Sequence, residues 1–278
     1  SKSNRSDPSL PLSLIAVACY LIGAAWLAVA AYRGASHQGR GGRIAAVAIA
    51  AVGVVVTAAA VLGRHRTVAG SALTMGDTAA IVAIIVASTA IAMAFRPRLR
   101  GIAALLLFIA AILEGAFFAG AREFEVGRPG WELAFHIAVA TTAFAFLTIG
   151  AVLAIAQVMV DKRLRSRKPL GWLKILTPLE SLESGCFQSI IAGFLLLTLA
   201  LVSGAFFIED LFAQHLVHKV VLAMTAWVVF GILLFGRMRF GWRGRQAMRW
   251  TLAGYILLGL SYFGSKLVLE TLLGRHWG

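Results

Sequence analysis

Eight long apolar stretches, separated by short connections that hold most of the Lys and Arg residues, limit what this sequence can fold into. Each is close to the ~20 residues that a helix needs to cross the ~30 Å hydrocarbon core of a bilayer. Hydrophobic residues make up 60% of the chain and the mean hydropathy is +0.85, which excludes an ordinary water-soluble domain. We therefore predict an all-α, polytopic membrane protein, a bundle of eight transmembrane helices at residues 12–32, 44–63, 77–95, 101–118, 132–159, 183–207, 217–236 and 248–272.

The Lys and Arg residues predict how these helices are oriented. The first, third, fifth and seventh connections, counted with Arg249 at the start of the eighth stretch, hold 17 of the 26 Lys and Arg residues. The positive-inside rule therefore places these connections in the cytoplasm. Both termini then face the periplasm of a bacterial inner membrane. The net charge of +14 falls on the cytoplasmic side, where anionic lipid headgroups balance it, and we predict no nucleic-acid partner.

The chain shows no internal repeat and no loop long enough to fold alone, so residues 1–278 are predicted to form a single integral membrane domain. Residues 1–130 hold the first four helices, built mainly from Ala, Val, Ile and Gly, and residues 131–278 hold the last four. Cys19 and Cys186 are expected at depths that differ by ~15 Å, too far apart for a disulfide.

Four of the six histidines fall at the predicted outer ends of helices: His136, His215, His218 and His276. His215 and His218 are three residues apart on one helix, so both point the same way and cannot hold one haem iron from opposite sides. A bis-imidazole haem site needs ligands from two elements. His136 with His276, or His136 with one histidine of the seventh helix, meets that requirement.

Two alternatives for these histidines stay open. His215 and His218, with Glu209 or Asp210 close by in the sequence, would suit a tetrahedral metal ion. A histidine at a membrane interface can also hydrogen-bond lipid headgroups and need no ligand.

Four segments of the second half resemble the cytochrome c assembly family of haem-handling membrane proteins. The resemblance is strongest to its CcsA-like branch, which includes the HemX and YpjD proteins. It implies a haem held at the outer face by His136 and His276, with carriage or presentation expected in place of enzymatic turnover. It also implies a recipient, an apocytochrome or another haem-receiving membrane protein. The segments follow the family's order: 135–156, 203–219, 241–247 and 262–276.

The sequence departs from the family where a Trp-rich external loop would cradle the porphyrin. Phe206, Phe207 and Asp210 occupy that region, without a tryptophan. The phenylalanines, together with Phe212, would cover a porphyrin edge, and Lys219 would meet a haem propionate. His215 and His218 follow just downstream.

Glu114 is the most informative charge inside a predicted span. An ionised carboxylate costs about 2 to 3 kcal/mol near the bilayer centre, and less near the interface, so we expect this side chain to turn inward. It would then accept a hydrogen bond from a haem or metal ligand, or serve proton-linked transport. Lys266 and Glu270, four residues apart, are expected to pair with each other.

Two other functions remain open. The chain could be a transporter or transporter accessory subunit, in which Glu114 would matter more than the histidines. It could also be a membrane scaffold that has lost haem binding and meets a partner through its basic loop, where Arg243 and Arg245 lie. The few charges inside the spans argue against an ion pump.

Overall fold

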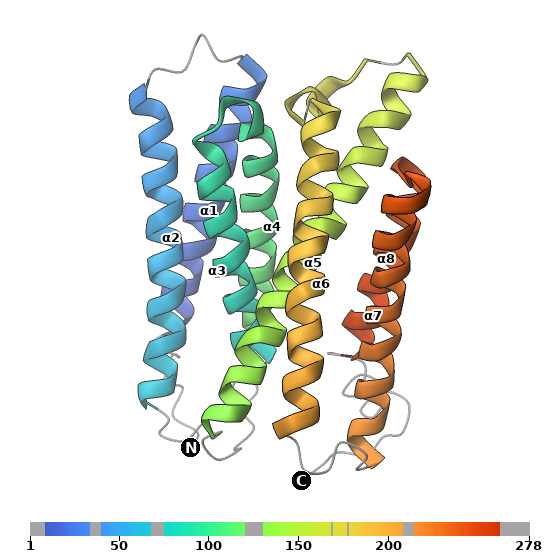
Figure 1. Cartoon of the computed structure of the whole chain (residues 1–278). Helices are drawn as coiled ribbons and strands as arrows, with labels where there is room; N and C mark the ends of the chain where they lie inside the picture. Colours follow the sequence, from blue (N-terminus) through green and yellow to red (C-terminus); the bar gives the residue numbers. More distant parts are fainter. Residues whose placement is uncertain are drawn as a thin grey trace. The chain divides into compact units, whose positions relative to one another are not determined.

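The structure is a computed structural model that describes residues 9–33, 40–67, 75–119, 130–167, 169–176, 178–207 and 214–261. At several helix ends it describes the backbone alone, as at Phe207, His215 and His218. All regular structure in these ranges is helical (Figure 1), which confirms the all-α prediction for this part of the chain. The elements are α1 (Ser9–Arg33), α2 (Arg40–Thr67), α3 (Met75–Ala94), η1 (Pro97–Leu99), α4 (Arg100–Ala119), α5 (Trp131–Arg165), η2 (Gly171–Leu176), α6 (Leu179–Phe207), α7 (Gln214–Phe240) and α8 (Gly244–Gly259).

Within these residues, seven helices, α1 to α7, are long and apolar enough to cross a membrane. Each matches one predicted span. The largest difference is in α5, which continues past residue 159 to Arg165. Its last turn holds Lys162, Arg163 and Arg165, and cations at a helix C-terminus stabilise the helix beyond its apolar part. The eighth predicted span begins in α8 and extends past the described residues, so the number of spans and the sides of the termini stay predictions.

The helices form two compact units. The N-terminal unit, Ser1–Pro129 with Ser166–Ser181, contains α1 to α4 and the short helices η1 and η2. The C-terminal unit, Gly130–Arg165 with Leu182–Gly278, contains α5 to α8. The division near residue 130 separates the same two sets of four helices that the composition distinguished. That the whole chain is a single integral membrane domain stays a prediction.

Small residues hold the N-terminal unit together. Helix α1 packs on α2 and α4, and α3 packs on α2 and α4, with alanines buried on all four helices. Small side chains let helix backbones approach closely in lipid. The fully buried Tyr20 lies against Gly53, where a Cβ atom would stand 2.7 Å from its ring, and its hydroxyl is 3.1 Å from that of Thr57.

One glycine fixes how η2 packs on α4. A Cβ atom at Gly101, in the first turn of α4, would overlap the backbone carbonyl of Ile175 in η2. A backbone carbonyl held in a helix cannot move aside as a flexible side chain can. Gly101 is therefore the residue that lets the segment before α6 lie on the N-terminal unit.

We predict that Gly101→Ala destabilises the protein by about 1 to 3 kcal/mol, the usual cost of forcing extra volume into a packed site. The matched control is Gly115→Ala on the same helix, where an added Cβ atom meets nothing within 4 Å. Thermal unfolding in detergent should show a lower midpoint for the first variant only. Equal midpoints for the two variants would contradict this packing.

Glycines also set the contact between α5 and α6. A Cβ atom at Gly150 of α5 would be 2.8 Å from Ile190, and one at Gly193 of α6 would be 2.6 Å from Leu147. Cys186 of α6 donates a hydrogen bond to the carbonyl of Gly150 at 3.4 Å, and both cysteines of the chain are free thiols. These contacts run along the two helices in one register, which makes α5 and α6 an antiparallel pair.

Polar atoms inside the C-terminal unit tie the other helices to this pair. Trp227 of α7 donates its indole hydrogen to the hydroxyl of Thr198 in α6 at 2.8 Å, and its ring stacks on Phe194. Tyr255 of α8 shares a 3.0 Å hydrogen bond with the hydroxyl of Thr148 in α5. Because lipid offers no water to satisfy polar groups, such pairs fix which residues of neighbouring helices stand opposite each other.

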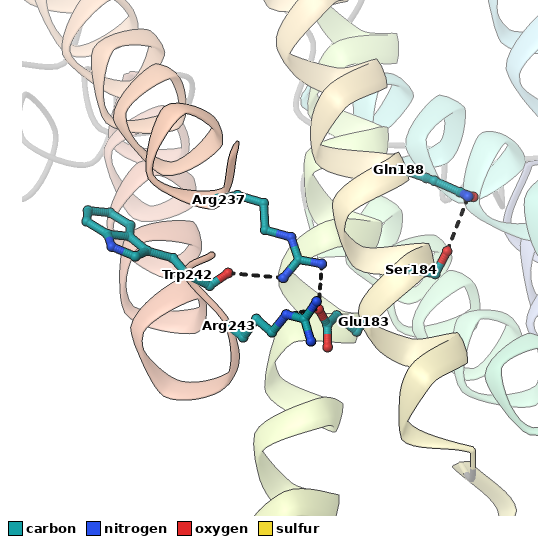
Figure 2. A network of polar contacts seen from close by, with 6 residues as sticks. All are labelled: Glu183, Ser184, Gln188, Arg237, Trp242 and Arg243. Atoms are coloured by element: carbon teal, nitrogen blue, oxygen red, sulfur yellow. Dashed lines mark hydrogen bonds and ion pairs between the residues drawn. The ribbon is translucent and has the colours of Figure 1, made fainter. Parts of the chain in front are cut away.

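An ion-pair cluster joins α6, α7 and the turn into α8 (Figure 2). The Glu183 carboxylate lies 2.7 Å from Arg237 and 3.2 Å from Arg243. Arg237 also donates to the carbonyl of Trp242 at 3.4 Å and lies over the ring of Phe187. Arg243, which lies in the basic loop predicted as a partner contact of a scaffold, is thus engaged by Glu183. We call Glu183, Arg237, Trp242 and Arg243 the turn clamp.

We predict that Glu183→Gln lowers stability by about 1 to 3 kcal/mol, because it removes charge-assisted bonds to two arginines. Asp161→Asn makes the same charge change at the ion pair with the exposed Arg165 and should cost less than about 1 kcal/mol. Chemical unfolding in detergent compares them. A clamp without structural importance would leave the two variants equally stable.

Candidate functional site

One end of the C-terminal unit carries His136, the predicted haem ligand whose side chain the structure describes, and we call it the His136 end. Helix α5 begins there at Trp131 and α6 ends there at Phe207, as Figure 1 shows. Helix α7 begins there at Gln214, so the backbones of His215 and His218 lie at this end too. Ser261, the last described residue of the chain, donates a hydrogen bond to the carbonyl of Lys219 at 2.7 Å. All four helices of the unit therefore meet at the His136 end.

The imidazole of His136 lies half-buried between α5 and α6. Its Nδ1 atom is 3.1 Å from the hydroxyl oxygen of Ser203, and that hydroxyl donates to the carbonyl of Ala200 at 3.0 Å. Ser203 itself is buried, with 5% of its surface exposed. The Nδ1 edge of the ring is thus held by α6, and Nε2 is the nitrogen that Ser203 does not use.

A glycine makes room for this ring. A Cβ atom at Gly204 would stand 3.0 Å from Cε1 of His136 and 3.4 Å from Nδ1, tighter than most real contacts. Glycine therefore allows the imidazole to rest against the α6 backbone. Ser203 and Gly204, adjacent in the sequence, contact the same ring, one by a hydrogen bond and the other by leaving space.

Large aromatic side chains are exposed at the same end. Trp131 and Phe135 of α5 are 72% and 44% exposed, and Phe206 of α6 is 81% exposed. Exposed aromatic residues near the end of a membrane helix serve either the aromatic belt of the bilayer or a flat apolar ligand. Phe206, one of the phenylalanines predicted to cover a porphyrin edge, is therefore exposed at the surface.

The other predicted site residues are only partly placed. Lys219 is exposed on the first turns of α7. The side chains of Phe207, His215 and His218 are outside the described part, so neither the bis-imidazole alternative nor the tetrahedral-metal alternative on α7 is tested. The following predicted residues lie outside the described residues altogether: Glu209, Asp210, Phe212, Lys266, Glu270 and His276.

Glu114 lies in the N-terminal unit, near the end of α4, and no part of it is exposed. Asp77, at the start of α3, is buried as fully, and Arg100, at the start of α4, is 6% exposed. The inward orientation expected for Glu114 agrees with this burial. Its role toward a ligand or in transport stays a prediction.

Sequence reasoning did not assign a role to Ser203 or Gly204. Both stood in a segment that resembles the family, but nothing in the sequence pairs residue 203 of one helix with residue 136 of another. That pairing follows from the register of α5 on α6, which depends on which glycines face which large side chains. The sequence gives one signal for this pairing. A serine and a glycine stand side by side at the end of one span, and the preceding span begins near a histidine.

The described half of the donor set fits an axial ligand to haem iron. Neutral imidazole binds iron through one nitrogen while the other donates a hydrogen bond that orients the ring. His136 has such a partner for Nδ1, a half-buried ring, and exposed aromatic side chains on its own helix and on α6. These residues are of the kind that one histidine ligand of a haem would need.

Comparison with known proteins identifies a family over most of the chain. The family model for cytochrome C assembly protein matches residues 13–273. No solved structure matches the chain.

Three relatives illustrate the range of similarity. The inner membrane protein YpjD of Escherichia coli (strain K12) is 36% identical over 135 residues, 49% of this chain and 51% of YpjD. An uncharacterized 28.8 kDa protein of Azospirillum brasilense is 33% identical over 178 residues, which are 61% of this chain and 63% of that protein. The cytochrome c biogenesis protein CcsA of Synechococcus sp. (strain CC9902) is 26% identical over 54% of this chain and 57% of CcsA.

These alignments span between about half and two thirds of each relative's length. The helices, the inner-membrane relatives and the family model describe the same kind of molecule. Its described residues include seven helices long and apolar enough to cross a membrane, and the chain belongs to the cytochrome c assembly protein family.

Proposed function

We propose that this chain binds haem at the His136 end and carries or presents it at the periplasmic face of the inner membrane. The recipient would be an apocytochrome or another haem-receiving membrane protein. The observation that carries the proposal is the geometry of His136, whose ring is held through Nδ1 and lies against Gly204. Membership of the cytochrome c assembly family and similarity to CcsA, a cytochrome c biogenesis protein, support it.

Each described residue would have a distinct part in this function. His136 would bind the iron through Nε2, and α6 would keep the ring from turning. Phe206 and Phe135 would cover apolar parts of the porphyrin, because both are exposed at the His136 end. Lys219, exposed on α7, would meet a propionate as an opposite charge. Bound haem would supply a redox-active iron, and two imidazole ligands would leave that iron little room for oxygen chemistry.

The second axial ligand is proposed from the family resemblance to be His276. One histidine of α7 is the alternative, because the backbones of His215 and His218 lie at the His136 end. The two candidates make different predictions for single substitutions. His276→Ala and the double variant His215→Ala/His218→Ala therefore belong in the same experiment.

We expect purified protein, expressed with haem precursor supplied, to show a Soret band with near-stoichiometric haem. His136→Ala should lower the haem content by more than about tenfold, because even losing the outer partner of a ligand can cost that much affinity. His65→Ala is the control, since that histidine stands in the basic run Arg64-His65-Arg66. Haem per protein, measured as the pyridine haemochrome, checks both.

Two results would count against haem carriage by His136. A native protein that stays colourless with haem supplied would remove the proposed function. A His136→Ala variant that binds haem as well as the native protein would place the iron ligand elsewhere.

Transport is the second candidate function, and the burial of Glu114 favours it. An ionisable residue buried within a span is costly and usually serves a function or a pair. Haem-free native protein would make Glu114→Gln the first substitution to study in a transport assay. If the native protein binds haem and Glu114→Gln binds as much, Glu114 takes no part in haem binding.

A further inference from the structure

We propose that Ser203 is a positioning residue, which fixes the His136 imidazole in the tautomer with its proton on Nδ1 and its free lone pair on Nε2. Gly204 keeps the ring in place for that bond. The tautomer claim stands on the structure of the protein without haem. Its consequence for iron binding rests on the proposed function.

The first step is that the Ser203 hydroxyl has only one proton to donate. That hydroxyl lies 3.0 Å from the carbonyl oxygen of Ala200, which can only accept a hydrogen bond. When the proton points to Ala200, the Ser203 oxygen presents lone pairs to Nδ1 of His136 at 3.1 Å. The contact is then a hydrogen bond only if Nδ1 carries a hydrogen and donates it.

The second step is the neutral imidazole, which has one protonated and one unprotonated nitrogen. A proton on Nδ1 leaves the lone pair on Nε2, the atom an iron would need. The opposite assignment turns the Ser203 proton toward Nδ1 and puts the imidazole proton on Nε2, where it blocks a metal. Ligand histidines usually have their tautomer fixed by an outer hydrogen bond of this kind.

The third step is the space at Gly204. Of the three ring atoms near a Cβ atom added there, Cε1 would be at 3.0 Å, Nδ1 at 3.4 Å and Nε2 at 3.9 Å. An alanine would press on the edge of the ring that faces Ser203. The ring would have to shift by some tenths of an ångström, away from the hydrogen bond. Ser203 and Gly204 therefore act on one variable, the placement of Nδ1.

The variants separate positioning from simple packing. Ser203→Ala removes the hydroxyl with little change in volume, and Ser203→Thr restores it. The matched control is Thr198→Ala on the same helix. It also removes a hydroxyl, but one that bonds to Trp227 and not to His136. A hydroxyl that only holds helices together would affect the two alanine variants alike.

The first measurement uses the haem-free, full-length protein with ¹⁵N-labelled histidine in detergent micelles. Nitrogen NMR distinguishes protonated from unprotonated ring nitrogens, and the His136 signals are assigned as those missing from His136→Ala. We expect the Nδ1-protonated tautomer in the native chain, Ser203→Thr and Thr198→Ala, and both tautomers in Ser203→Ala. A native chain with the proton on Nε2, or Ser203→Ala with unchanged nitrogen signals, would overturn the proposal.

The second measurement is haem titration of the same proteins. Ser203→Ala should bind haem about 10- to 100-fold more weakly than the native chain, the usual effect of losing the outer partner of a metal ligand. Ser203→Thr and Thr198→Ala should stay near the native affinity. Native affinity in Ser203→Ala, with binding lost in His136→Ala, would refute the effect of Ser203 and leave haem binding intact.

A native chain that binds no haem would remove the proposed function and the consequence of the tautomer for iron. The nitrogen signals would still decide whether Ser203 fixes the tautomer of His136. The two failures are thus distinguishable.

Discussion

The close approach of α5 and α6 determines where the other groups of the C-terminal unit lie. In lipid, helices gain little from burying apolar surface and associate through tight packing and internal hydrogen bonds. Gly150, Gly193 and Gly204 each face a side chain of the partner helix that a Cβ atom would crowd. This contact fixes one register, from the hydrogen bond between Cys186 and Gly150 midway along α5 to the imidazole of His136 near the start of α5. A shift by one residue would turn the imidazole away from Ser203.

Other contacts of the unit position α7 and α8 on α6. The turn clamp ties Glu183 of α6 to Arg237 of α7 and to Arg243 before α8, and Thr198 holds Trp227 midway. Helices α7 and α8 are thereby positioned relative to α6. The His136 end is consequently the place where ordered helix ends carry one oriented imidazole and several exposed aromatic side chains. The proposal of haem binding rests on these features.

Composition and charge pattern were sufficient to predict the helices and the membrane class, because a span must be apolar over ~20 residues and such runs are visible in any sequence. Family segments then pointed to His136. The overlap between Gly101 and η2 and the bond from His136 to Ser203 were not predictable, because each joins residues that are distant in the sequence. Arg243 shows the same limit. Its basic loop suggested a partner contact, yet Glu183, sixty residues earlier, engages it. His276, Asp210 and Glu209 lie outside the described residues, so their assignment still rests on the sequence.

The measurement that tests the central claim most directly is the axial ligation of the bound haem. Near-infrared magnetic circular dichroism of the ferric protein reports which ligands occupy the two axial positions. The native chain should show the charge-transfer band of two imidazole ligands, and His136→Ala should lose that band even where some haem remains bound. An identical spectrum in both proteins, or one without imidazole ligation in the native chain, would contradict the assignment of His136 as an iron ligand.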